Sequence, residues 1–270
     1  FCDVDLHTFN TTADLIEPHI NDKTKAIVPV HLYGQACDMS SIINLAEKYK
    51  LKIIEDNAQA IGCKYTFPNE EIKFTGTMGN IGTTSFYPSK NLGCYGDGGA
   101  IFTNDNYLAE KIKMIVNHGE KIKYHHDIVG CNSRLDSIQA EILNIKLKYL
   151  DDYNSNRKIM ANNYNLAFKD IQYIQIPKVI LNSEHVFHQY TLRVLNGKRD
   201  DLKDYLNNMG VPTMIYYPIP IHKQRAYLSG QSLANTDILS KEVISLPIHT
   251  ELEASNQDYI IQNVINFFKN

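Results

Sequence analysis

The sequence lacks the patterns that mark several large classes of protein. It has no apolar run long enough to cross a bilayer, and its first residues show no basic segment followed by an apolar one. It has no C-x-x-C pair, no H-E-x-x-H and no other spacing of metal ligands, so we expect no metal site. Basic residues are not in surplus, with 27 Lys and Arg against 30 Asp and Glu, so we expect no nucleic-acid partner.

Cysteine is sparse, and its spacing suggests no pairing. The chain has an odd number of cysteines, at Cys2, Cys37, Cys63, Cys94 and Cys131. Such scattered residues are typical of free thiols in a reducing compartment and not of a disulfide framework. Together with the missing membrane and signal patterns, this predicts a cytoplasmic protein.

The residues that are present suffice for a sizeable core. The chain has 270 residues, of which 43% are hydrophobic and 21% charged, enough for one large domain or two modest ones. A β-branched run at 26–30, a helix capped by Ser40 and Ser41 that runs to Lys50, and a buried strand ending at Asp56 predict a βαβ unit. The fold class is therefore α/β with a mostly parallel sheet.

The second half has a different pattern. We expect a helix from about Asp151 to Phe168, then strand-like runs such as 186–194 and a helix near 199–209. This predicts a large domain over 1–150, followed over 151–270 by a linker helix and a smaller α+β domain. The segment 120–130 is polar and basic and predicts a mobile loop, in which Lys121, Lys123 and His125 either contact a diphosphate or are solvated.

One lysine stands out by its surroundings. Lys90 lies between Ser85 and Ser89 on one side and the glycines at 93, 96, 98 and 99 on the other. A partly desolvated amine loses its proton more easily, as a Schiff-base lysine requires. The alternative is an ordinary surface lysine beside a turn.

Two upstream residues strengthen the case for chemistry at Lys90. Asp56 ends a predicted strand, at the edge of an α/β sheet where ligands bind, and Gln59 follows three residues later. A carboxylate for a pyridine nitrogen, an amide for a ring oxygen and a lysine amine together suggest pyridoxal phosphate.

Four ordered segments then carry a resemblance to a known family. VPVHLYGQ, IIEDNAQAIG, TTSFYPSKNLGCYGDGGAI and GCNSRLDSIQAEIL resemble the DegT/DnrJ/EryC1/StrS family of pyridoxal-phosphate-dependent aminotransferases for nucleotide-linked keto-sugars. The resemblance implies fold-type I, as in aspartate aminotransferase. Members usually carry an N-terminal region before the segment that corresponds to the start of this sequence, so the chain is expected to lack that region.

The resemblance also implies roles for single residues. Ser85 would hydrogen-bond the cofactor phosphate, and Asn132 would reach the phosphate of the cofactor in the neighbouring subunit of a homodimer. Arg134 would bind the donor carboxylate, with a plain ion pair equally open. Tyr217 and His222 are candidate substrate contacts, with packing as the alternative.

The function that follows is transfer of an amino group from glutamate to a nucleotide-linked keto-sugar through a Lys90 Schiff base. The segment around 125–143 is most similar to members that act on dTDP-linked 3-keto-6-deoxyhexoses for surface polysaccharide such as lipopolysaccharide, with a 4-keto substrate next. Two alternatives stay open: a sugar dehydratase, in which a histidine replaces the lysine, and a catalytically silent dimer that has lost the cofactor.

Overall fold

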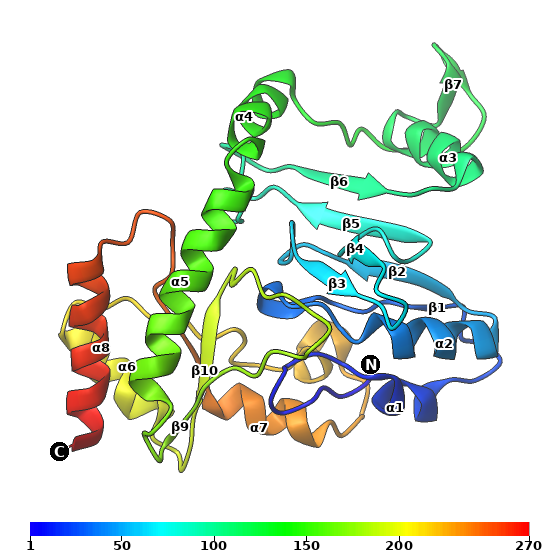
Figure 1. The fold of residues 1–270 in the computed structure, drawn as a ribbon. Helices are drawn as coiled ribbons and strands as arrows, with labels where there is room; N and C mark the ends of the chain where they lie inside the picture. The colour runs from blue at the N-terminus through cyan, green and yellow to red at the C-terminus, as the bar shows by residue number, and fades with distance from the viewer. Residues whose placement is uncertain (270) are drawn as a thin grey trace.

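A computed structural model describes residues 1–269. A four-stranded sheet in the order β1-β2-β5-β6 occupies the first half of the chain (Figure 1). The first three strands run parallel and the last is antiparallel, so the predicted α/β fold with a mostly parallel sheet is confirmed. Its strands are β1 (Ala26–Ile27), β2 (Lys52–Asp56), β5 (Ile81–Ser85) and β6 (Gly99–Phe102).

Helix α2 (Met39–Tyr49) connects β1 to β2 and packs on the sheet through an apolar face (Figure 1). Met39, Ile42 and Ala46 are buried on that face. The helix begins one residue after Asp38, earlier than the predicted caps Ser40 and Ser41, because the Asp38 carboxylate at the N-cap accepts a hydrogen bond from the Ser41 hydroxyl.

The predicted strand at 26–30 is shorter in the structure. Regular pairing ends at Ile27, and Pro29 has no N–H to donate to a ladder. The carbonyl of Pro29 still accepts from the backbone N–H of Asp56 at 2.9 Å, and Val30 bridges to Asp56. The chain therefore stays beside the end of β2, where the site forms.

The segment predicted as a mobile loop is instead a short hairpin. Helix α3 (Asn106–Val116) leads into β7 (Glu120–Ile122) and β8 (His125–His126), which extend away from the sheet as an arm (Figure 1). Gly119 and Tyr124 take positive φ values of 77° and 68°, which turn the chain at each end of β7. The hairpin's own hydrogen bonds explain why a polar segment is ordered here.

Two helices join the halves of the chain. They are α4 (Ser137–Leu147) and the long α5 (Leu150–Phe168), and Lys148 and Tyr149 separate them. Ile138, Ile142 and Ile145 lie at offsets of three and four in the sequence, a spacing that predicts packing either in the core or at an interface. This apolar stripe of α4 is largely exposed, with Ile138 at 75% and Ile145 at 54%. The prediction that this stripe packs in the core of its own subunit is therefore wrong, and the prediction that it packs at an interface stays open to test.

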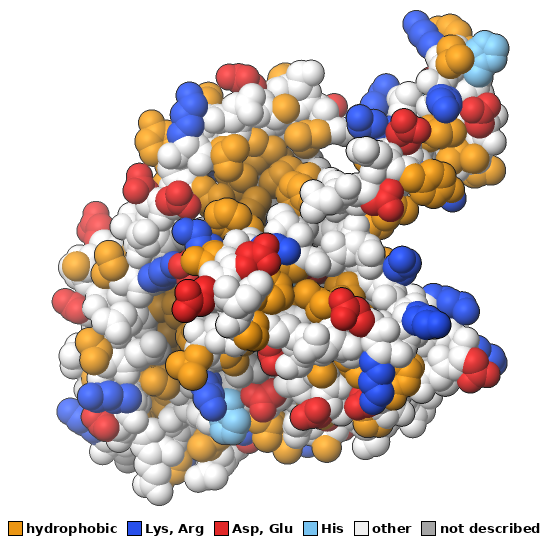
Figure 2. All heavy atoms as spheres, turned by 45° about the vertical axis from the view of Figure 1, so that its right-hand side comes forward, with side chains coloured by type: hydrophobic (Ala, Val, Ile, Leu, Met, Phe, Trp, Pro, Cys, Tyr) orange, Lys and Arg blue, Asp and Glu red, His pale blue; other side chains and the backbone are white. Residues whose placement is uncertain are grey.

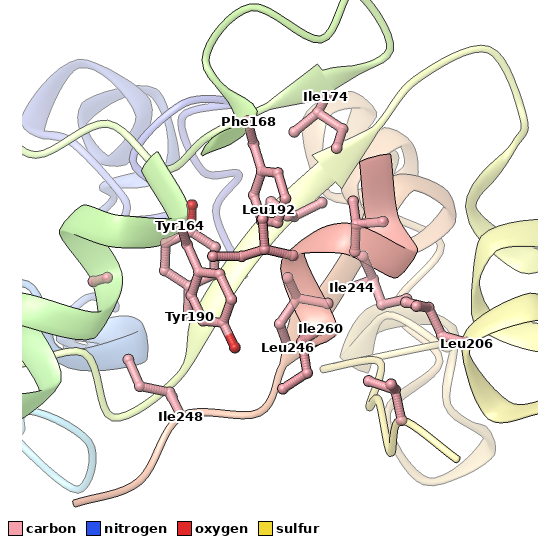
Figure 3. Close-up of a cluster of buried hydrophobic side chains, with 14 of the residues drawn as sticks. Tyr164, Phe168, Ile174, Tyr190, Leu192, Leu206, Ile244, Leu246, Ile248 and Ile260 are labelled. Atoms are coloured by element: carbon pink, nitrogen blue, oxygen red, sulfur yellow. The ribbon is translucent and has the colours of Figure 1, made fainter. Parts of the chain in front are cut away.

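The second half forms around an antiparallel sheet in the order β11-β10-β9. Both faces of the sheet are covered, so all five residues of β10 are buried. Figure 3 shows Leu192 and Tyr190 of β10 against Tyr164 and Phe168 of α5. The predicted strand at 186–194 begins only at Tyr190. The elements are β9 (Ile174–Gln175), β10 (Tyr190–Val194), α6 (Arg199–Asn208), α7 (Ala234–Glu242), β11 (Val243–Leu246) and α8 (Ala254–Lys269).

Short elements complete the described chain. They are α1 (Ala13–Ile16), the hairpin of β3 (Lys64–Thr66) and β4 (Ile72–Phe74), and 3-10 turns at Glu17–His19, Leu32–Gly34, Ile221–Lys223 and Arg225–Tyr227. None of the helices within residues 1–269 combines the length and apolar character that a membrane crossing demands.

Candidate active site

A cavity of about 460 Å³ opens at the carboxyl end of β5. Four of the predicted site residues line it: Gln59, Ser85, Lys90 and Tyr217. The parallel strands β2 and β5 end at the same edge of the sheet, which brings the segments after them together. The remaining lining residues are Tyr87, Ser89, Asp97, Gly98, His188, Gln189 and Tyr216.

Lys90 is half-buried in this wall, on a turn in which its backbone N–H donates to the carbonyl of Tyr87 at 2.8 Å. Burial lowers the pKa of the Lys90 amine, and the negative charge of Asp56 partly opposes that shift. The structure therefore places the two residues within electrostatic reach of each other. An amine that loses its proton readily is a better nucleophile than an exposed lysine.

Asp56 is the last residue of β2 and is held from both sides. Its backbone N–H donates to Pro29, its carbonyl accepts from His31 at 3.0 Å, and its Oδ1 accepts from the N–H of Ala58 at 3.0 Å. These bonds fix the start of the turn that carries Gln59. The side chain is not part of the cavity lining but contributes charge to it.

Glu55, one residue earlier, points away from that site. Its carboxylate is fully buried and accepts from the backbone N–H groups of Gly76 at 2.8 Å and of Met78 and Gly79 at 2.6 Å. The side chain of His31 is also fully buried, and its Nε2 lies 2.9 Å from Oε2 of Glu55. Burial raises the pKa of the Glu55 carboxyl, but the hydrogen bonds outweigh it and the net shift is downward. The pair supports the loop behind Asp56, a role that sequence reasoning missed.

Gln59 and Ser85 both have partners within the site. Oε1 of Gln59 accepts from the N–H of Tyr33 at 2.7 Å, and Oγ of Ser85 accepts from the N–H of Tyr87 at 3.2 Å. Each side chain keeps donor groups free for a ligand, since an amide has two N–H donors and a hydroxyl has one. Their predicted cofactor contacts stay predictions.

The segment around Tyr217 closes the cavity from the second half of the chain. The hydroxyl of Tyr33 donates to the carbonyl of Tyr216 and so anchors this segment. Burial raises the pKa of Tyr217, with the hydrogen bond from Gln59 acting against it. His222 lies apart: it is buried, outside the lining, with Nε2 3.4 Å from Oδ1 of Asp237. Its predicted substrate contact has no support in this placement.

Asn132 and Arg134 are exposed near the base of the arm. Nε of Arg134 donates to Oδ1 of Asn132 at 3.1 Å, and Nη1 donates to Oδ1 of Asn117 at 3.4 Å. Neither lines the cavity of its own subunit. Their predicted contacts require a second subunit and stay predictions.

Sequence reasoning also missed His188 and Asp97 in the cavity wall. Asp97 was within the glycine-rich run, where a polar residue among glycines was a usable signal. His188 follows an apolar pair in a segment expected to be strand, where alternation alone could not mark it.

The residues present fit pyridoxal phosphate. The wall offers an amine at Lys90 and hydroxyls at Ser85 and Ser89. The carboxylate of Asp56 complements a protonated ring nitrogen. Within residues 1–269 no group of three or more His, Cys, Asp or Glu side chains is arranged to hold a metal ion.

Comparison with known proteins agrees with this donor set. The model of the DegT/DnrJ/EryC1/StrS aminotransferase family matches residues 1–265. The chain is 43% identical over 276 residues to the pleiotropic regulatory protein of Geobacillus stearothermophilus, covering 100% of the chain and 72% of that protein. It is 44% identical over 262 residues to dTDP-3-amino-3,6-dideoxy-alpha-D-galactopyranose transaminase of Aneurinibacillus thermoaerophilus, covering 96% and 70%.

Solved structures show the same fold. The crystal structure of S. venezuelae DesV in complex with a ketimine intermediate matches with a TM-score of 0.92 and 36% identity, over 98% of this chain and 71% of that one. NtdA from Bacillus subtilis with bound cofactor PMP matches with a TM-score of 0.90 and 34% identity, over 100% and 62%. The chain therefore belongs to the DegT/DnrJ/EryC1/StrS family of pyridoxal-phosphate-dependent sugar aminotransferases.

Proposed function

We propose that this aminotransferase moves an amino group from glutamate to a dTDP-linked 3-keto-6-deoxyhexose, with Lys90 as the residue that attaches the cofactor. The observation that carries the proposal is the half-buried Lys90 amine in a cavity at the end of β5, with the Asp56 charge acting on it. A sugar dehydratase is disfavoured because the residue at this position is lysine.

The chemistry divides between the cofactor and the chain. When bound, pyridoxal phosphate supplies an aldehyde that accepts amines and a ring that withdraws electrons from the adjacent carbon. Asp56 would keep the ring nitrogen protonated, and the Ser85 hydroxyl would donate a hydrogen bond to a phosphate oxygen. Nζ of Lys90, once free, would move a proton from the α-carbon of the amino donor to the cofactor carbon, and in the reverse steps would deliver a proton to the sugar carbon that receives the amine.

Other residues would hold the substrates. Tyr217 lies in the lining and offers a phenol to a sugar hydroxyl or to the donor. We keep Arg134 as the partner of the donor carboxylate and Asn132 as a phosphate contact, both across a subunit boundary. Gln59 would bind the ring oxygen. His222 is buried and lies outside the lining, so its substrate contact stays a prediction without support from the cavity.

We propose a homodimer with shared active sites. Support comes from the apolar surface beside the sheet: Ile138 and Ile145 of α4 and Ile101 of β6 are exposed, and Figure 2 shows hydrophobic side chains gathered in the upper part of the body, to the left of the projecting arm. Exposed apolar area of this kind is typical of an interface. Replacing Ile138 with glutamate should shift the mass in light scattering to that of a monomer, whereas Leu181→Glu, at a fully exposed leucine, should not.

We also propose that the chain forms two domains that divide near residue 150, and that the protein is located in the cytoplasm. The two largest cores support the division, since one cluster gathers residues 16–65 with Val186 and another residues 160–264. A smaller cluster of Phe9, Tyr33, Leu239 and Val243 packs the two parts together. The unpaired state of all five cysteines supports the compartment. Cleavage between 147 and 150 by limited proteolysis, with both fragments retained, would support the boundary; cleavage elsewhere first would contradict it.

The names of relatives support the choice of ring carbon. The relatives from Pseudomonas aeruginosa and Acidithiobacillus ferrooxidans are named for UDP-linked 3-oxo sugars, and those from Streptomyces venezuelae and Aneurinibacillus thermoaerophilus for dTDP-linked 3-amino sugars. All place the nitrogen at carbon 3. The choice of dTDP over UDP is the part of the proposal that an assay must decide.

The test combines cofactor trapping with a substrate panel. Borohydride treatment of the protein with pyridoxal phosphate should leave the cofactor's mass on the peptide containing Lys90, and Lys90→Ala should carry none. A separate, unreduced sample of the wild type loaded with pyridoxal phosphate is assayed with glutamate and dTDP- or UDP-linked 3-keto and 4-keto sugars. Absence of label would reject the role of Lys90 and support a catalytically silent protein. Label with turnover of only 4-keto or UDP sugars would reject the proposed substrate.

A further inference from the structure

His188 forms part of the cavity wall and is 5% exposed. It lies in the irregular segment just before β10. Its Nδ1 is buried and has no hydrogen-bond partner among the described residues. Because buried polar atoms are nearly always paired, an orphaned ring nitrogen in a cavity wall indicates a partner that the functional state supplies.

The backbone of His188 is fixed relative to the lysine loop. Nη1 of Arg157 on α5 donates to the carbonyls of Phe187 at 3.1 Å and of His188 at 3.3 Å. Asn91, next to Lys90, donates to the carbonyl of Val186 at 3.0 Å. The backbone segments that carry His188 and Lys90 are therefore tied to each other and are not independent loops.

The ring of His188 is neutral. Burial lowers its pKa to about 3, and the positive charges of Lys90 and Arg157 act in the same direction. A neutral imidazole keeps one nitrogen as an acceptor, whereas a charged one has two donors. The other charged or titratable groups around the two side chains are Asp56, Tyr87, Asp97, Tyr216 and Tyr217.

We propose that His188 is a positioning residue for Lys90, and that its ring accepts a hydrogen bond from Nζ whenever that amine is not attached to the cofactor. The inference rests on the proposed role of Lys90. The hydrogen bond would keep the freed amine in the cavity, oriented toward the substrate carbon between its two proton transfers. It would also give the orphaned nitrogen its partner.

The experiment measures the acylation of Lys90 in cofactor-free protein as a function of pH, by peptide mass spectrometry. An accepted hydrogen bond favours the ammonium form, so His188→Leu should lower the pH midpoint of Lys90 acylation. His188→Gln keeps an acceptor oxygen and should restore much of the midpoint. His185→Asn is the matched control, because His185 is equally buried but does not line the cavity, and its midpoint should equal that of wild type.

Kinetics of the loaded enzyme give a second readout. His188→Leu should lower kcat roughly tenfold or more, with the KM of the amino donor nearly unchanged, because the lost contact acts on proton transfer and not on ground-state binding. His188→Phe serves the same comparison if the leucine variant does not fold.

Equal midpoints in wild type and His188→Leu, or a midpoint that rises, would overturn the proposal. Failure here is distinguishable from failure of the proposed function. If borohydride labels Lys90 but the midpoints coincide, only the role of His188 is rejected. If Lys90 takes no label, the proposed function is rejected whatever the midpoints are.

Discussion

Asn91, the residue after Lys90, donates through Nδ2 to Oδ1 of Asn154 at 2.7 Å, although the two lie 63 residues apart in the chain. Asn154 in turn donates to the carbonyl of Ile61 at 3.2 Å. Both asparagine side chains are buried. Helix α5 therefore fixes the lysine loop and the turn after Asp56 at once, so the position of Lys90 depends on a residue outside every sequence motif around it.

We predict that Asn154→Ala destabilises the fold and loosens the lysine loop. The substitution leaves the buried amide of Asn91 with one acceptor fewer, which costs about 1–3 kcal/mol in the free energy of unfolding. Urea unfolding measures the loss. Asn144→Ala, on the exposed face of α4, should change it by no more than about 0.5 kcal/mol. Equal effects of the two substitutions would contradict the proposed tie.

Glu55→Gln should destabilise the protein at neutral pH by about 1–3 kcal/mol, because three backbone N–H groups and His31 lose a charged acceptor. The folded pKa of Glu55 is lowered, so its stabilisation is complete above the ordinary value of 4.5 and disappears as pH falls through the folded pKa. The difference between wild type and variant should therefore shrink in acid. A difference that stays constant down to the acid transition would show that the charge is not its source.

Stability should also fall as pH drops below 6.5, because His185 is buried and its pKa is lowered to about 3. The unfolded chain binds a proton in this window that the folded chain does not, so protons favour unfolding. At pH 5 the loss from this histidine amounts to about 2 kcal/mol. His185→Asn keeps an acceptor for the N–H of Phe187 and should reduce the slope to about half, because His188, whose pKa is lowered to about 3 as well, still contributes the rest. Chemical denaturation at several pH values measures the slope. An unchanged slope would mean that His185 titrates normally.

Leu192→Ala should cost about 2–5 kcal/mol, because Leu192 is fully buried in the core of Figure 3 and the loss leaves a cavity. Thermal or urea unfolding checks this value. Leu181→Ala, at a fully exposed leucine, is the control and should be nearly neutral. A small effect at Leu192 would indicate that this core collapses to fill the space.

Subunit complementation tests the role of Asn132. Lys90→Ala and Asn132→Ala variants should each be inactive or nearly so. In mixed dimers one of the two sites would combine a native Lys90 with a native Asn132 from the other subunit, so activity should return to roughly a quarter of wild type after random mixing. If Asn132 acts within its own subunit, the mixture should stay inactive.

Much of the site edge could be predicted from sequence because it depends on local signals. A strand that ends in Asp56 and a lysine beside a glycine-rich turn are properties of short segments, and in the structure the parallel pairing of β2 with β5 brings them together. Gln59 and Tyr217, two further predicted site residues, also line the cavity. His188 did not, because its place depends on Arg157 and on the irregular chain before β10.

The errors in the predicted elements have the same origin. The strand predicted at 26–30 ends at Ile27, shortly before Pro29, and the segment 120–130 predicted as a loop forms a hairpin through its backbone hydrogen bonds. The α4 stripe has helical spacing whether it faces the core or another subunit, so periodicity could not decide between them.

By itself the sequence determined the fold class, the family resemblance and the residues that supply an amine and a carboxylate, since these depend on residue type and local order. Only the tertiary structure decided that Glu55 supports the fold beside Asp56, that Asn154 holds the lysine loop, and that His188 stands in the cavity with an unpaired nitrogen. These relationships join residues far apart in the chain, and contacts of that kind are set by how the elements pack and not by the pattern within any one of them.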